Sequence, residues 1–151
     1  MAAREIIIRI VQSSDRAEWL RLRSLLWDET EESEHLAEME EILDHQDTQL
    51  VLVASERDSL IGFLEVSIRP HAEDCETDNV GYLEGWYVEQ EYRRTGIGRS
   101  LVSNAEQWAR DCGCVEMASD AEFGNEESIA AHSQLGYSET SRLVHFRRFI
   151  G

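Results

Sequence analysis

The sequence has few of the residues that characterise disulfide-rich or metal-binding proteins. Its 151 residues include three cysteines and one proline. An odd number of cysteines in a chain of this length argues against a disulfide scaffold. Cys112 and Cys114 are separated by a single residue, which is closer than the roughly two to four residues that usually separate paired zinc ligands. We therefore expect neither disulfides nor a metal site.

Basic residues and long apolar runs are also scarce. There are 14 basic residues against 31 acidic ones, and the formal net charge of −17 repels nucleic acid and anionic membranes while it attracts cations. No apolar run approaches the roughly 20 residues of a membrane-spanning helix. The first five residues, Met1 to Glu5, lack the basic start and apolar stretch of a secretory signal. We expect a cytoplasmic protein with a small cationic partner, and no binding to nucleic acid or membrane.

The apolar pattern that is present predicts a single domain over residues 1–151. Expected strands are 5–11, 49–55, 60–69, 80–88, 115–119 and 142–149, and expected helices are 13–27, 35–44, 96–112 and 126–135. Residues 80–119 form a strand–helix–strand unit, whose two strands should be parallel. The order predicts an α/β (α+β) fold with a mixed central sheet and helices on both faces.

A segment rich in glycine and arginine joins the expected strand 80–88 to the next helix. It reads Arg93-Arg94-Thr95-Gly96-Ile97-Gly98-Arg99. The start of a helix offers free backbone N–H groups to a phosphate, and glycines let the phosphate approach closely. Arginine side chains would add charge. A dinucleotide-binding motif needs a third glycine near Leu101, and a P-loop needs Gly-Lys-Ser/Thr; the sequence has neither. We interpret the segment as another kind of phosphate-binding turn.

From Gly85 to Leu101 the chain resembles motif A of the GNAT superfamily of acetyltransferases, whose signature is Gln/Arg-x-x-Gly-x-Gly/Ala. Arg93, Gly96 and Gly98 match that signature. The resemblance implies that acetyl-CoA is the co-substrate, with its pyrophosphate on this loop and its pantetheine and thioester on the preceding strand. The coenzyme-binding residues so implied are Trp86, Tyr87, Val88, Arg93, Arg94, Thr95, Gly96, Ile97, Gly98 and Arg99. An N–H directed at the thioester carbonyl would stabilise the oxyanion intermediate.

Further segments resemble one branch of that superfamily, the aminoglycoside 6'-N-acetyltransferases. They are Leu25-Leu26-Trp27, Glu40-Glu41-Ile42-Leu43, Tyr82-Leu83-Glu84-Gly85, Glu116-Met117-Ala118-Ser119-Asp120, and Asn125 followed by His132-Ser133-Gln134-Leu135-Gly136-Tyr137. The resemblance implies a substrate site formed by Trp27, Thr30, Ala72, Glu84, Asp120 and Ser141, and coenzyme contacts from Asn125 and His132. It also implies a homodimer formed through the C-terminal strands.

The charge pattern agrees with an aminoglycoside, because aminoglycosides are polycations. Two acidic runs fall in the expected substrate loops: Asp28, Glu29, Glu31, Glu32 and Glu34, then Glu73, Asp74, Glu76 and Asp78. The substrate ammonium must lose a proton before it attacks the thioester, and Asp120 or Glu84 could accept it or act only as an anchor. The superfamily often has a tyrosine as general acid where this chain has His132.

Other functions share part of this pattern. A polyamine or another small polycationic amine would suit the same charge. A non-catalytic acyl-CoA sensor could keep the fold without the chemistry. An acetyltransferase for protein N-termini or lysines is a third alternative. A cysteine nucleophile has no supporting pattern around any of the three cysteines.

Overall fold

The structure is a computed structural model that describes residues 5–151. The described chain falls into two compact units, one ending at Ser119 and the other spanning Asp120–Gly151, and each is considered by itself. The interpretation of the chain start as lacking a secretory signal depends on residues 1–4, which lie outside the described residues. No helix within residues 5–151 is long and apolar enough to cross a membrane.

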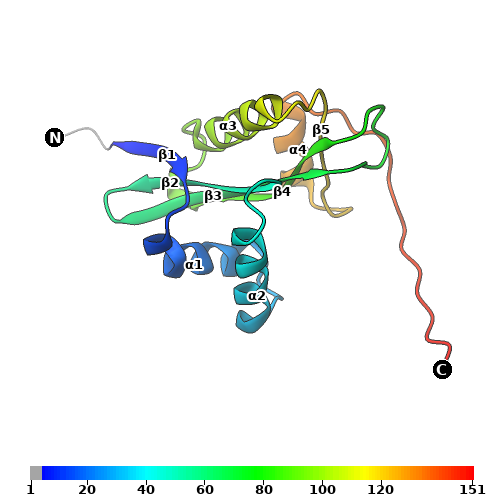
Figure 1. Cartoon of the computed structure of the whole chain (residues 1–151), viewed down its shortest axis with the longest axis horizontal. Coiled ribbons are helices and arrows are strands. Elements are labelled where there is room, and N and C mark those ends of the chain that lie inside the picture. The colour runs from blue at the N-terminus through cyan, green and yellow to red at the C-terminus, as the bar shows by residue number, and fades with distance from the viewer. Residues whose placement is uncertain (1–4) are drawn as a thin grey trace. The chain divides into compact units, whose positions relative to one another are not determined.

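The first unit is a five-stranded sheet with helices on both faces (Figure 1). Its elements are β1 (Ile6–Ile10), η1 (Ser13–Asp15), α1 (Arg16–Leu26), α2 (Glu32–Leu43), β2 (Gln49–Glu56), β3 (Ser59–Arg69), β4 (Val80–Val88), η2 (Gln90–Tyr92), α3 (Ile97–Asp111) and β5 (Met117–Ser119). The strand order is β1-β2-β3-β4-β5, and the β4–β5 pair is parallel while the others are antiparallel. Helices α1 and α2 cover one face and α3 the other. The predicted mixed sheet is confirmed.

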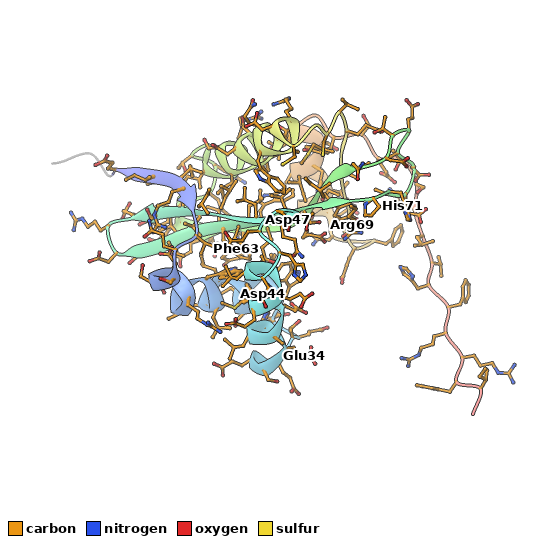
Figure 2. All side chains as sticks on the ribbon, in the orientation of Figure 1. Glu34, Asp44, Asp47, Phe63, Arg69 and His71 are labelled. Carbon is orange, nitrogen blue, oxygen red and sulfur yellow. The ribbon has the colours of Figure 1, made fainter. Side chains whose placement is uncertain are left out.

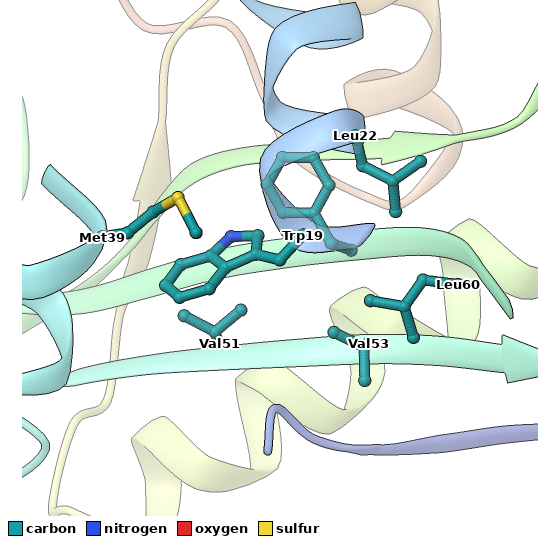
Figure 3. Packing of buried hydrophobic residues seen from close by; sticks show 7 residues of the cluster. Trp19, Leu22, Met39, Val51, Val53 and Leu60 are labelled. Carbon is teal, nitrogen blue, oxygen red and sulfur yellow. The ribbon is translucent and has the colours of Figure 1, made fainter. Parts of the chain in front are cut away.

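The core beneath α1 and α2 joins these helices to the sheet (Figure 3). Trp19 and Leu22 of α1 and Met39 of α2 pack on Val51, Val53, Leu60 and Phe63 of the sheet. Trp19 and Leu22 are three residues apart, which places them on one face of the helix. Figure 2 shows Phe63 on the α1 side of the sheet. Full burial of such a side chain contributes about 1.5–3 kcal/mol, so this cluster fixes α1 on the sheet.

A β-bulge changes the alternation of side chains along β4. Adjacent residues of β3 pair with Leu83 and with Gly85, so Glu84 is an extra residue in the ladder. Leu83 and Gly85 therefore face opposite sides of the sheet. A Cβ on Gly85 would lie 2.5 Å from Cζ2 of Trp27, at the end of α1. Glycine is needed here because a rigid indole lies directly against the strand.

The second unit contains one helix, α4 (Glu126–Gln134). Residues 138–151 form neither helix nor strand, so the strand predicted at 142–149 is wrong. A strand needs a neighbouring strand for its backbone hydrogen bonds, and the described unit has no other. The large apolar residues of this segment are exposed instead: Leu143, Val144, Phe146, Phe149 and Ile150.

Candidate functional site

The predicted phosphate-binding segment connects β4 and η2 to α3. Gly96 is the N-cap of α3, with a φ of 89°, a left-handed conformation that favours glycine. A Cβ there would meet no atom within 4 Å, so the requirement is one of backbone conformation rather than space. The first turn of α3 contains no acidic residue. The positive end of the helix dipole is therefore available for an anion.

Arg93 fixes the shape of this loop. Its Nε donates to the carbonyl oxygen of Val88 at 2.8 Å, and its guanidinium lies 5.3 Å from the ring centre of Tyr87. These contacts tie the loop to the end of β4, a role that the sequence analysis missed. Of the other segment residues, Arg94, Thr95, Gly96 and Arg99 are exposed, Gly98 is half-buried and Ile97 is buried.

The strand that leads into the loop has a backbone edge that β5 does not cover. β5 pairs with β4 only from Gly81 to Leu83 and ends at Ser119. Along Trp86 to Val88, no strand of residues 5–119 pairs with that edge. Such an edge presents backbone N–H and C=O groups to an extended ligand. This is the stretch where backbone contacts to the coenzyme were predicted.

An open pocket of about 550 Å³ is lined by residues of α1, α2 and the sheet, and we call it the α1–α2 pocket. It is lined by Arg23, Trp27, Thr30, Ala37, Glu38, Glu41, Ile42, Gln49, Glu65 and Glu84. Four glutamates and one arginine in this lining give an excess of negative charge, which attracts a cation. The structure thus brings together three predicted substrate residues, Trp27, Thr30 and Glu84.

Glu84 is held by its neighbours in the sheet. Its Oε1 accepts from Ser67 Oγ at 2.6 Å and from Arg69 Nε at 3.1 Å and Nη2 at 2.9 Å. Its Oε2 accepts from Arg69 Nη2 at 2.7 Å. Arg69, at the end of β3 (Figure 2), also lies over the ring of Tyr82, 3.4 Å from its centre. A carboxylate with this many donors suits an electrostatic anchor better than a proton acceptor.

A buried polar cluster of three residues supplies two of the residues that line the α1–α2 pocket, Arg23 and Glu65. Arg23, His35 and Glu65 have relative exposures of 2%, 1% and 5%. Arg23 Nη1 donates to the Glu65 oxygens at 3.1 and 2.9 Å, and Trp19 Nε1 donates to Glu65 at 2.9 Å. Burial raises the pKa of Glu65 to about 7, while Arg23 and the Trp19 indole oppose that rise. Arg23 also forms an ion pair with Glu38.

Arg23 and Glu65 were not predicted as site residues, although their positions in the sequence carry a signal. Arg23 lies four residues after Trp19 and so falls on the apolar face of α1. Glu65 lies two residues after Phe63, on the same side of β3. A charged residue at a position whose periodicity predicts burial indicates a buried ion pair.

The remaining predicted residues lie in the second unit or in the loop before β4. Asn125 caps α4, since its Oδ1 accepts from the backbone N–H of Ser128 at 3.1 Å. His132 Nδ1 donates to the Ser128 carbonyl oxygen at 2.7 Å. Both side chains therefore stabilise the helix. Asp120 and Ser141 are exposed, and Ala72 is half-buried. Asp120 directly follows Ser119, the β5 partner of Leu83.

Comparisons with known proteins show the family to which the chain belongs. Residues 19–137 match the model of the acetyltransferase (GNAT) family. The chain is 42% identical to an aminoglycoside N(6')-acetyltransferase type 1 of Klebsiella aerogenes, covering 94% of this chain and 95% of the relative. It is 43% identical to one of Acinetobacter genomosp. 13, covering 93% and 97%. The structure of AAC(6')-Iy in complex with a bisubstrate analogue, CoA-S-monomethyl-acetylneamine, superposes with a TM-score of 0.90 at 33% identity, covering 97% and 99%. The chain is therefore a member of the GNAT acetyltransferase family.

Proposed function

We propose that the protein is an acetyl-CoA-dependent aminoglycoside 6'-N-acetyltransferase, which would confer antibiotic resistance. The observation that carries the proposal is the acid-lined α1–α2 pocket in a chain at least 42% identical, over nearly its whole length, to two aminoglycoside N(6')-acetyltransferases. A pocket with four glutamates and one arginine selects for a polycation. Membership of the GNAT acetyltransferase family supports acetyl-CoA as the acetyl donor.

We assign acetyl-CoA to the loop and to the part of β4 that β5 does not cover, Trp86 to Val88. The left-handed N-cap at Gly96 supports a pyrophosphate at the start of α3, with Arg94 and Arg99 exposed nearby in the sequence. The backbone from Trp86 to Val88 would bind the pantetheine and direct an N–H at the thioester carbonyl. Asn125 and His132 remain predicted coenzyme contacts from the second unit.

We assign the aminoglycoside to the α1–α2 pocket. Trp27 offers an aromatic face to a sugar ring or an ammonium group, and Glu84 supplies negative charge beside it. Thr30 contributes a hydroxyl at the same wall. Asp120, Ala72 and Ser141 are assigned to this site by the resemblance that predicted them.

The reaction follows from these assignments. The neutral 6'-amine attacks the thioester carbon, the C–S bond breaks, and the CoA thiolate leaves and takes a proton. Before the attack, the ammonium loses its proton to a carboxylate. We infer that Asp120 is this base and that Glu84 is an anchor, because Glu84 already accepts four hydrogen bonds from Ser67 and Arg69.

The test is CoA release with a panel of amines. We expect turnover with kanamycin-type aminoglycosides that carry the 6'-amine and none with analogues that lack it. Equal rates on both would contradict 6'-regiochemistry. Faster turnover of polyamines would favour the alternative substrate, and no release of CoA with any amine would favour a sensor. Asp120→Ala should abolish turnover while coenzyme binding persists.

We also infer that the enzyme is a cytoplasmic homodimer. Leu143, Val144, Phe146, Phe149 and Ile150 are all exposed, and a second copy would bury them against an apolar surface. Sedimentation velocity should give a dimer for the full chain and a monomer after removal of residues 142–151. A monomeric full chain at micromolar concentration would contradict the dimer.

A further inference from the structure

Trp27 lies at a position where a helix ends, which is ordinarily a mobile part of a chain. It is the C-cap of α1, with φ −114° and ψ 71°, and the segment after it forms a turn. An aromatic wall at such a position needs further contacts to stay in one place. The structure supplies them from two buried polar side chains, Arg23 and His35, which nothing in the assignment of the site explains.

His35 joins the two contacts. Arg23 Nε donates to His35 Nδ1 at 3.2 Å, so this nitrogen is unprotonated and the proton of the neutral ring is on Nε2. His35 Nε2 lies 3.2 Å from the carbonyl oxygen of Trp27 and therefore donates to it. The same carbonyl accepts from the backbone N–H of Thr30 at 3.2 Å. The main chain of Trp27 is thus tied to the first turn of α2.

Arg23 contacts the ring of the same residue. Its guanidinium carbon lies 4.8 Å from the centre of the Trp27 ring, within the range of a cation–π interaction. Phe63 packs edge-on against the indole, with ring centres 6.0 Å apart. Arg23 keeps its place because Glu65 accepts two of its hydrogen bonds within the buried cluster. One arginine therefore fixes both the indole and the histidine that holds its carbonyl.

We propose that Arg23 and His35 are positioning residues that fix Trp27 as the wall of the α1–α2 pocket and so set the affinity for the amine substrate. The proposal rests on the proposed function insofar as the amine binds beside Trp27. The hydrogen bonds and ring contact of these two residues go to the buried cluster and to Trp27, whereas the coenzyme loop, residues 93–99, begins only after the end of β4. Loss of His35 therefore raises the KM for the amine and leaves the KM for acetyl-CoA unchanged.

The test compares His35→Leu with His35→Gln. Leucine removes both hydrogen bonds, whereas the amide of glutamine can accept from Arg23 and donate to the Trp27 carbonyl. We expect His35→Leu to raise the amine KM about tenfold, which corresponds to the loss of one buried hydrogen bond, and His35→Gln to restore it to within about twofold. Met39→Ala is the matched control: Met39 is fully buried one turn further along α2, and its loss should lower stability without changing either KM.

A double-mutant cycle separates positioning from general destabilisation. In a Trp27→Ala background, His35→Leu should have no further effect on the amine KM. An equal fold-increase in both backgrounds would overturn the proposal, as would an unchanged KM in the single variant. If His35→Leu does not fold, His35→Asn replaces it, since the shorter side chain cannot reach the Trp27 carbonyl.

A readout without substrate separates this proposal from the proposed function. Fluorotryptophan NMR gives one resonance for each of the four tryptophans, and Trp27→Phe identifies that of Trp27. His35→Leu should shift or broaden the Trp27 resonance and leave that of Trp108, on α3, unchanged. An unchanged Trp27 resonance would refute the positioning role. A changed resonance in a protein that acetylates no amine would support it and refute only the proposed function.

Discussion

The α1–α2 pocket includes Glu84 from the middle of β4, and the coenzyme loop follows the end of that strand, but the two sites are built in different ways. The loop is a short contiguous segment whose shape depends on backbone conformation, with φ values of 64° at Arg94 and 89° at Gly96. The pocket gathers side chains from α1, α2, β2, β3 and β4 around a buried ion pair. One site is encoded locally, and the other depends on tertiary packing.

The largest expected effect is a loss of stability when the buried ion pair of the α1–α2 pocket is broken. Arg23→Met leaves Glu65 buried without its guanidinium partner, and breaking a buried pair in this way costs about 3–5 kcal/mol. Urea unfolding at pH 7 measures the loss. Replacing Glu65 by Met in the same chain should recover most of it, because an apolar pair leaves no charge uncompensated. A single variant as stable as the wild type would contradict the role of the ion pair.

The free energy of unfolding should depend on pH through the protonation of Glu65. Burial raises its pKa from 4.5 to about 7, so between these values the folded protein binds more protons than the unfolded chain. The contribution of Glu65 to the free energy of unfolding therefore falls as pH rises through this window. Glu65→Gln removes that dependence, a change on the order of 1–3 kcal/mol between pH 5 and pH 8.

Urea unfolding of both proteins at these two pH values is the measurement. Glu29→Gln, at an exposed glutamate of the turn after α1, is the control and should follow the wild type. If wild type and Glu65→Gln lose stability in parallel with pH, Glu65 does not titrate in this window.

A smaller effect is expected at the coenzyme loop. Gly96→Ala forces a residue with a Cβ into a φ of 89°, at a cost of about 1–2 kcal/mol. We expect the acetyl-CoA KM to rise about tenfold while the amine KM stays constant, the reverse of the result for His35→Leu. Gly113→Ala has the same strain, with φ 92°, at the other end of α3. It should lower stability equally and change neither KM.

The smallest effect is expected at Arg69. Its guanidinium occupies the Glu84 carboxylate that we assign to a substrate ammonium, so the two cations compete. Arg69→Gln should lower the amine KM by up to about fivefold, the range of a partly exposed ion pair. Arg110→Gln, which removes the same charge from α3, should not. A higher amine KM in Arg69→Gln would mean that Arg69 orients Glu84 for binding.

The contrast between the two sites explains what the sequence could predict. The glycine–arginine loop was identified from adjacent residues and lies within residues 19–137, which match the GNAT family model; its role in binding the coenzyme stays a prediction. The strands and helices of the first unit were predicted to within a few residues. Helix α2 begins earlier than expected, at Glu32, because acidic residues in a first turn interact favourably with the helix dipole. Part of the first acidic run, which was expected in a substrate loop, is therefore helical.

The buried cluster could not be predicted as a site, because it depends on which helix faces meet. His35 and Arg23 are 12 residues apart and Glu65 is 42 residues beyond Arg23. The position of Arg23 in its helix and of Glu65 in its strand predicts that each is buried, but it does not predict which residues they contact. The strand predicted at 142–149 was wrong for a related reason, because a strand depends on pairing with a neighbour that the local residue pattern does not specify.

The bulge at Glu84 reverses which residues of β4, odd-numbered or even-numbered, face a given side of the sheet. Before it, odd-numbered residues such as Gly81 face α3, where its Cβ position lies 2.9 Å from Ala109. After it, odd-numbered residues such as Tyr87 face α1. Deleting this one residue would rotate the remainder of the strand by half a period, so that Trp86 and Tyr87 would exchange faces. Glu84, whose carboxylate is proposed to hold the substrate, is thus also the inserted residue that determines which side chains of Trp86 to Val88 face α1 and which face α3.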